Sequence, residues 1–405
     1  MIRFVTSGMA CLCVVLGVLV MVRPVTSRTA FAAVESPAVF QWNKPDWAPT
    51  PIVPSDNPMT AAKVQLGRRL FYDERLSRDG SLSCANCHQQ ARAFTDGKPV
   101  HLGVNGELGI RNAMTLTNVA YLPTYTWTNP LLTSLEQQMQ VPLFGDHPIE
   151  MGMAGHETQL IAALSTDPKY PCQFAQAFPE DGNPITLPHM LKAIGAFERT
   201  LLSFDSTYDH YKHGDSNAIS AAAKRGEALF FGERLDCYHC HGGINFTDNH
   251  IQQGQAIAER GFHNTGLYNE DGLGAYKSWD HGLRGVTGNE DDEGAFRTPT
   301  LRNVAVTAPY MHDGSVATLR DVILHHYAVK GHAALGPSGA NPLRSEFIEG
   351  FKLSETETRD LIAFLESLTD ETFLHNPEFS DPSANSANAT VPAHTKERGV
   401  HGKSK

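Results

Sequence analysis

Apolar residues recur at helical spacing along several stretches of the chain, whereas the alternation typical of strands is scarce. Two stretches, 63–76 and 224–235, are amphipathic and similar to each other, and two more run over 187–204 and 355–368. Loops rich in Gly and Pro occupy most of the remaining chain. The pattern predicts a mainly α fold with little β structure.

A short cysteine motif follows each of the two similar helices. Both copies read C-x-x-C-H, at 84–88 and at 237–241. In c-type cytochromes the two thiols of this motif bond the porphyrin and the adjacent His binds the iron. A single C-x-x-C also suits zinc, a redox pair or a disulfide, but two copies, each with its own His, favour haem. The expected haem-binding residues are Cys84, Cys87, His88, Cys237, Cys240 and His241.

Further repeats surround these motifs in the same order. Phe-Thr-Asp occurs at 94–96 and 246–248, and Thr-Leu-Thr-Asn-Val-Ala at 115–120 is echoed by Thr-Leu-Arg-Asn-Val-Ala at 300–305. The duplication predicts two tandem cytochrome c-like domains with one haem each. The predicted divisions are a signal peptide 1–32, an extension 33–54, domains 55–213 and 214–375, and a disordered tail 376–405.

The first residues resemble an export signal. Arg3 precedes an apolar run over 4–22, and Ala30-Phe31-Ala32 matches a signal-peptidase site. We therefore expect a periplasmic protein that is cleaved near Ala32. The run is also long enough for an uncleaved membrane anchor, which is the alternative. No later stretch approaches a membrane span, so the remainder is expected to be soluble.

The net charge excludes some classes of partner, and the remaining cysteine and the acidic run are expected to have structural roles. The net charge of −11 argues against nucleic acid or an anionic membrane as a partner. Outside the signal and the two motifs only Cys172 remains, and we expect it to be a small buried apolar residue. The acidic run 290–293 is predicted to be a solvated loop.

Several motifs together resemble the bacterial dihaem cytochrome c peroxidase and MauG superfamily. They are the duplicated haem motifs, Phe-Thr-Asp-Gly at 94–97, Leu-Glu-Gln-Gln at 135–138, Pro-Ile-Glu-Met at 148–151 and the stretch 307–314. A narrower resemblance, at 125–130, 141–145 and 365–370, is to the MauG-like dihaem enzymes associated with methanobactin gene clusters.

The resemblance implies an open first haem. Val104 stands where the peroxidases carry a His that caps this iron, and a valine cannot bind iron; His101 is the alternative ligand. Glu150 matches the distal glutamate that moves the peroxide proton, with an ordinary exposed carboxylate as the alternative. Gln138 and Pro142 match residues lining the same pocket. Two extra residues within 144–147 separate Pro142 from Glu150, relative to the common pattern.

The second haem is expected to have a different cap. Its ligand should fall within 325–327, where there is no Met to match the peroxidases. A one-residue insertion leaves two alternatives, Tyr327 as in MauG, which we favour, and His326, because one helical step turns a side chain by about 100°. Met311 is a third candidate, with packing as its expected role.

The resemblance also assigns the region between the haems. Trp127 matches a tryptophan that relays electrons between the irons, with an ordinary core residue as the alternative. Asn112, Thr307 and Pro309 match the ligands of a calcium ion, and oxygen ligands of this kind suit a hard cation.

The function implied is a MauG-like dihaem oxidoreductase. It would use hydrogen peroxide to form a high-valent dihaem state that oxidises a residue of a periplasmic partner protein. The target would be a tryptophan, with a copper-binding protein as the candidate partner. One alternative is a cytochrome c peroxidase that reduces peroxide with electrons from a small cytochrome or cupredoxin. Another is a non-catalytic electron carrier, which Val104 disfavours.

Overall fold

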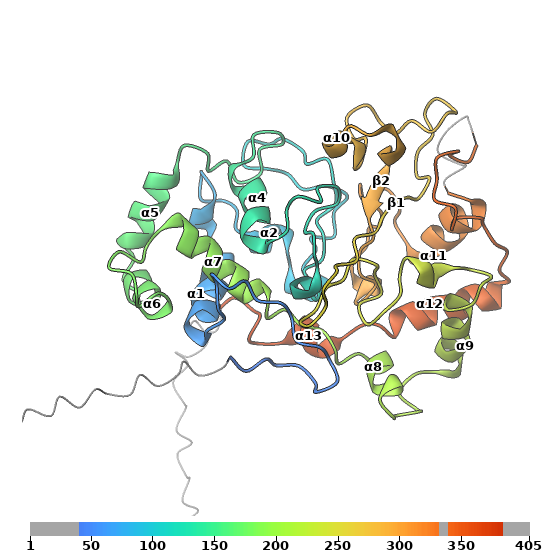
Figure 1. Ribbon diagram of the computed structural model, residues 1–405, viewed down its shortest axis with the longest axis horizontal. Helices are drawn as coiled ribbons and strands as arrows, with labels where there is room; N and C mark the ends of the chain where they lie inside the picture. Colours follow the sequence, from blue (N-terminus) through green and yellow to red (C-terminus); the bar gives the residue numbers. More distant parts are fainter. Residues whose placement is uncertain (1–39, 332–338, 384–405) are drawn as a thin grey trace, which may run out of the picture. The chain divides into compact units, whose positions relative to one another are not determined.

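The computed structural model describes residues 40–331 and 339–383, so the predicted signal peptide and the tail beyond 383 lie outside the described residues. Helices dominate this part of the chain, which confirms the prediction of a mainly α fold (Figure 1). The α-helices are α1 Ala61–Phe71, α2 Cys84–Cys87, α3 Leu135–Gln138, α4 Gln140–Phe144, α5 Glu157–Ser165, α6 Tyr170–Ala177, α7 Leu187–Glu198, α8 Thr207–Lys212, α9 Ala221–Phe230, α10 Arg284–Thr287, α11 Leu319–Asp321, α12 Glu355–Glu366 and α13 Glu371–His375.

The described β structure is a single antiparallel pair of short strands. β1 (Phe262–Asn264) pairs with β2 (Ala295–Arg297), with His263 opposite Phe296. None of the helices in the described ranges is long and apolar enough to cross a membrane.

Each repeat contains a closely packed helix pair, α1 with α7 and α9 with α12 (Figure 1). A glycine at the same place in the two repeats permits both contacts. A Cβ on Gly67 would lie 1.8 Å from the backbone oxygen of Ala193, and one on Gly226 would lie 2.0 Å from that of Asp360. Only glycine allows the backbones to approach so closely.

Each helix pair packs into its own hydrophobic cluster. One cluster combines buried residues between 66 and 201, including Phe71 and Phe197, with three buried residues between 373 and 379. The other combines residues between 208 and 368, including Phe230 and Phe364. All described residues belong to one compact unit. The predicted boundary between two haem domains therefore stays a prediction, since Phe373 and Leu374 of the second predicted domain belong to the first cluster.

Two buried asparagines join the repeats. Asn118 and Asn303 occupy the same position of the repeated Thr-Leu-x-Asn-Val-Ala segment, and both have a left-handed backbone, with φ of 54° and 62°. Asn118 donates to the side chain of Asn245 in the other repeat, at 2.8 Å. Asn303 likewise donates to Thr117, at 3.3 Å. The repeated segment is therefore the seam between the two halves.

Three details differ from the sequence-based predictions. Cys172 is exposed, because α6 directs Tyr170 and Phe174 to the core and so turns position 172 to solvent. In the acidic run Glu293 is buried, since His281 and Arg284 bind its carboxylate.

The third difference concerns the beginning of the predicted disordered tail. Phe379 is buried in the first hydrophobic cluster. Arg68 donates to the backbone oxygens of Pro377 and Ser380, at 2.6 and 2.7 Å. The disorder prediction is therefore wrong for 376–380, because the polar composition concealed one well-packed aromatic residue.

Candidate functional site

The two C-x-x-C-H motifs have the same local geometry. Nδ1 of His88 lies 2.8 Å from the backbone oxygen of Phe94, and Nδ1 of His241 lies 3.0 Å from that of Phe246. Both phenylalanines have positive φ, which turns their carbonyls toward the imidazoles. A hydrogen bond at Nδ1 fixes the ring orientation and leaves Nε2 as the metal ligand. The repeated Phe-Thr-Asp segment thus orients each proposed iron ligand.

A cavity of about 240 Å³ lies beside the second motif. Cys237, Cys240 and His241 line it, and most of the remaining lining is apolar. Burial lowers the pKa of His241, which keeps the imidazole neutral, as iron ligation requires. These residues fit a covalently attached haem, in agreement with the sequence-based prediction.

Tyr327 lines this cavity, whereas its neighbour His326 is fully buried outside the lining. The turn Val322–His326 is a π-helix, which contains one more residue than an α-helical turn. This turn provides a physical explanation for the one-residue insertion inferred from the sequence. Burial raises the pKa of the Tyr327 phenol, so its proton leaves only when a cation such as iron binds the oxygen.

The residues assigned to calcium and to electron relay line the same cavity. The lining includes Asn112, Thr307, Pro309, Trp127 and Met311. Met311 also packs against the cluster that contains Tyr268 and Tyr276. The structure thus brings together the three residues predicted to bind calcium, while the ion itself stays a prediction.

Both the indole ring and the backbone of Trp127 form hydrogen bonds, one with each repeat. Its indole N–H donates to the backbone oxygen of Asn112 at 2.9 Å, and its own backbone oxygen accepts from the N–H of Arg297 at 2.8 Å. Asn112 and Arg297 each stand three residues before the repeated threonine, at 115 and 300. Equivalent positions of the two repeats therefore fix this indole.

Around the first motif, Glu150 and Val104 are neighbours. The N–H of Val104 donates to the backbone oxygen of Glu150 at 2.8 Å. Pro142 is brought to the same place, because its backbone oxygen accepts from Met151 at 2.9 Å. The two extra residues between Pro142 and Glu150 therefore loop out without separating them. Gln138 ends α3, close in sequence to α4, which carries Pro142.

The electrostatic surroundings of Glu150 suit proton transfer. Burial raises the pKa of its carboxyl group, while the nearby His101 acts in the opposite direction. The charge of Glu150 also contributes to raising the pKa of Cys87, which places its carboxylate near the haem-attachment site. His101 Nδ1 lies 3.6 Å from an oxygen of Asp96. Its alternative role as an iron ligand stays untested.

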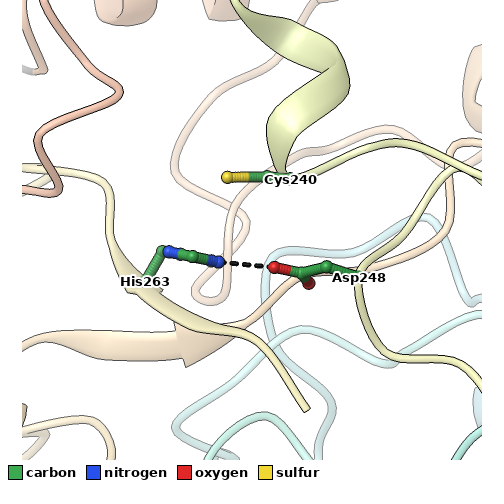
Figure 2. A group of neighbouring side chains, drawn as sticks. All are labelled: Cys240, Asp248 and His263. Carbon is green, nitrogen blue, oxygen red and sulfur yellow. Dashed lines mark hydrogen bonds and ion pairs between the residues drawn. The ribbon is translucent and has the colours of Figure 1, made fainter. Parts of the chain in front are cut away.

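Asp248 and His263 form a pair that the sequence did not reveal (Figure 2). Nε2 of His263 lies 2.6 Å from Asp248, and the sulfur of Cys240 is within 4.8 Å of both groups. Burial lowers the pKa of His263, but the hydrogen bond to Asp248 acts in the opposite direction, and the pKa is raised overall. Three such ligands can hold a metal ion, but the Cys240 sulfur is needed for haem attachment. The first repeat has a looser equivalent in Asp96 and His101.

Known proteins resemble this chain over most of its length. A family model for di-haem cytochrome c peroxidase matches residues 61–217. The methylamine utilization protein MauG of Methylophilus methylotrophus is 33% identical over 87% of this chain and 94% of its own. Cytochrome c551 peroxidase of Pseudomonas aeruginosa is 33% identical over 77% of this chain and 80% of its own.

Solved structures show the same relationship. The crystal structure of a MauG-like protein associated with microbial copper homeostasis has a TM-score of 0.82 and 48% identity, and the match covers 85% of this chain and 99% of that one. The dihaem peroxidase BthA of Burkholderia thailandensis, at 22% identity and a TM-score of 0.60, shares the fold.

Proposed function

The chain belongs to the dihaem cytochrome c peroxidase and MauG family of haem-dependent oxidoreductases, and we propose that it is a MauG-like member. In this proposal it uses hydrogen peroxide to oxidise a residue of a partner protein. Its relatives carry both peroxidase and MauG names, and their names therefore do not distinguish the two activities. We use the surroundings of the second haem to choose between them.

The observation that carries the proposal is the position of Tyr327 in the cavity beside His241. An anionic phenolate on iron favours the oxidised state, whereas a thioether ligand raises the reduction potential. A tyrosine-capped second haem is therefore poorly suited to accept electrons from a small carrier protein. His241 and Tyr327 would instead hold a haem that favours the oxidised state of its iron.

Once bound, the haems supply the redox chemistry with peroxide. The protein's contribution at the first haem is Glu150, whose half-buried carboxyl is proposed to move a proton between the two peroxide oxygens. Val104, whose backbone N–H donates to the backbone oxygen of Glu150, has an apolar side chain that cannot bind iron. Trp127, fixed between Asn112 and Arg297, is the proposed relay between the two haem sites.

The proposed partner is a periplasmic copper-binding protein with an oxidisable tryptophan. The similarity to a MauG-like protein associated with microbial copper homeostasis supports this choice, at 48% identity. We further propose that the N-terminal signal directs export to the periplasm. We also propose that a calcium ion binds at Asn112, Thr307 and Pro309.

Electron paramagnetic resonance of the resting ferric protein tests the ligand assignment. We expect one high-spin haem, from the open first site, and one low-spin haem. Tyr327→Phe should abolish the low-spin signal of tyrosinate ligation and raise the potential of the second haem. Met311→Leu, a change in the same cavity, should leave both unchanged. If Met311→Leu instead alters the low-spin signal and Tyr327→Phe does not, the ligand assignment is wrong.

Catalytic cytochrome c peroxidase activity is the second candidate, favoured by the named peroxidases among the relatives. Steady-state reduction of peroxide with a reduced small cytochrome or cupredoxin would reveal it. The MauG-like proposal instead expects slow turnover with such donors and a mass increase on a tryptophan of the copper-binding partner after peroxide addition. An unchanged partner mass together with fast donor oxidation would establish the peroxidase.

A further inference from the structure

Arg297 is a buried cation on the wall of the cavity beside the second haem motif. It ends β2, is only 3% exposed, and lines the cavity together with His241 and Trp127. Its Nε donates to the backbone oxygen of Thr126 at 3.1 Å, and Nη2 lies 3.2 Å from the sulfur of Met114. Its Nη1 is buried without a hydrogen-bond partner among the described residues.

The protein supplies no anion to balance this charge. Within the described ranges, no carboxylate forms an ion pair with Arg297 at 4.0 Å or less. Asp248 acts on Arg297 at longer range, but its carboxylate is already bound by His263 at 2.6 Å. Burial lowers the pKa of Arg297 to about 10, which leaves the guanidinium charged at neutral pH. A buried charge of this kind requires a partner.

We propose that Nη1 of Arg297 binds a carboxylate of the haem attached to Cys237 and Cys240. Haem carries two propionate carboxylates, and guanidinium is the side chain best matched to such a group. The proposal rests on the presence of the second haem and is independent of which substrate the enzyme oxidises.

The binding would also connect this haem to the proposed relay residue. The backbone N–H of Arg297 donates to the backbone oxygen of Trp127, and its Nε bonds the preceding Thr126. In the first repeat, the equivalent position is the neutral Asn112, which accepts from the indole instead. The cation is therefore specific to the second repeat. A positive charge beside one haem raises the reduction potential of that haem in particular.

The test uses the holoprotein and two variants, Arg297→Gln and Arg297→Lys. The readouts are the reduction potential of each haem by spectroelectrochemistry and the propionate bending bands by resonance Raman spectroscopy. We expect Arg297→Gln to lower the potential of the second haem and to shift its propionate bands, while the first haem is unchanged. Arg297→Lys should restore most of the potential but still shift the bands, because an ammonium cannot form the planar contact.

The outcomes are distinct. Second-haem propionate bands identical to wild type in Arg297→Gln would overturn the proposal, as would equal changes at both haems. Should Arg297→Gln not retain two haems, Arg297→Lys decides alone, since unshifted propionate bands would then overturn it. Arg111→Gln provides a matched control, because Arg111 lies near Phe296 but is already paired with Asp280 at 2.7 Å. It should leave the propionate bands unchanged.

Discussion

At the scale of single residues, burial gives Glu150 a raised pKa, a property useful for a carboxylate that both accepts and returns a proton. Glu150→Gln keeps the shape of the side chain but cannot transfer the proton. We expect the reaction with hydrogen peroxide to slow by about 10² to 10⁴-fold. Stopped-flow absorbance of the haem band measures this rate.

Glu107→Gln is the control for that prediction. Glu107 is an exposed carboxylate on the neighbouring loop that carries Val104, and it accepts a hydrogen bond from the N–H of Ile149. Its loss should change the rate little. Equal effects of the two variants would mean that Glu150 acts only through its negative charge.

Residue-level prediction was strongest where a motif fixes the chemistry, because each position of C-x-x-C-H has a defined role in binding haem. The structure adds matching Nδ1 contacts at His88 and His241, which the sequence did not predict. Prediction failed for Cys172, whose direction depends on which face of α6 meets the core. Arg297 and His263 carried no local signal, because their significance comes only from what the fold places beside them.

At the scale of elements, the seam asparagines hold the repeats together. Asn118 accepts from the backbone N–H of Ser203 at 2.7 Å and donates to the Ser203 oxygen and to Asn245. Asn118→Ala removes these buried bonds and places alanine in a left-handed backbone. We expect a loss of about 2 to 4 kcal/mol in the free energy of unfolding, measured by denaturant titration of the holoprotein.

The exposed Asn105 serves as the reference for this prediction. Asn105→Ala removes a surface hydrogen bond to Glu107 and should cost less than about 0.5 kcal/mol. Similar losses in the two variants would show that the seam contributes nothing beyond an ordinary surface loop.

Helices could be predicted where apolar residues recur at helical spacing. The four helical stretches correspond to α1, α7, α9 and α12, whose ends differ from the predicted ranges by up to six residues. The two insertions could be recognised in the sequence as departures from the pattern of the family, but their geometry could not be predicted. One lies between Pro142 and Glu150, where the contact of Met151 with Pro142 keeps the flanking residues together, and the other coincides with a π-helix.

At the scale of the whole molecule, the predicted calcium site would join the two repeats. Asn112 belongs to the first repeat, and Thr307 and Pro309 to the second, yet all three line one cavity. Removing calcium with a chelator should therefore lower the midpoint of thermal unfolding. Free calcium at about 100 times its Kd would contribute about 2.7 kcal/mol.

Calcium should restore the midpoint and magnesium should not, because magnesium prefers a tighter octahedral shell. Asn112→Ala should unfold at the lower midpoint with or without the chelator. If the chelator leaves the midpoint of thermal unfolding of the wild-type protein unchanged, the predicted calcium site is wrong.

The duplication was the whole-molecule property that the sequence revealed best. Equivalent glycines, asparagines and haem motifs recur in space as they recur along the chain. The contribution of 376–380 to the first core could not be foreseen, because the segment returns to that core from the far end of the chain.

The π turn at Val322–His326 has one more consequence. An imidazole and a phenol stand next to each other where the turn ends, and the extra residue determines which of the two lines the cavity. Deleting one residue from this turn, or adding one, can exchange the side chain that lines the cavity while both ligand candidates remain in the chain. Haem chemistry at this site can thus diverge through a length change as readily as through a substitution.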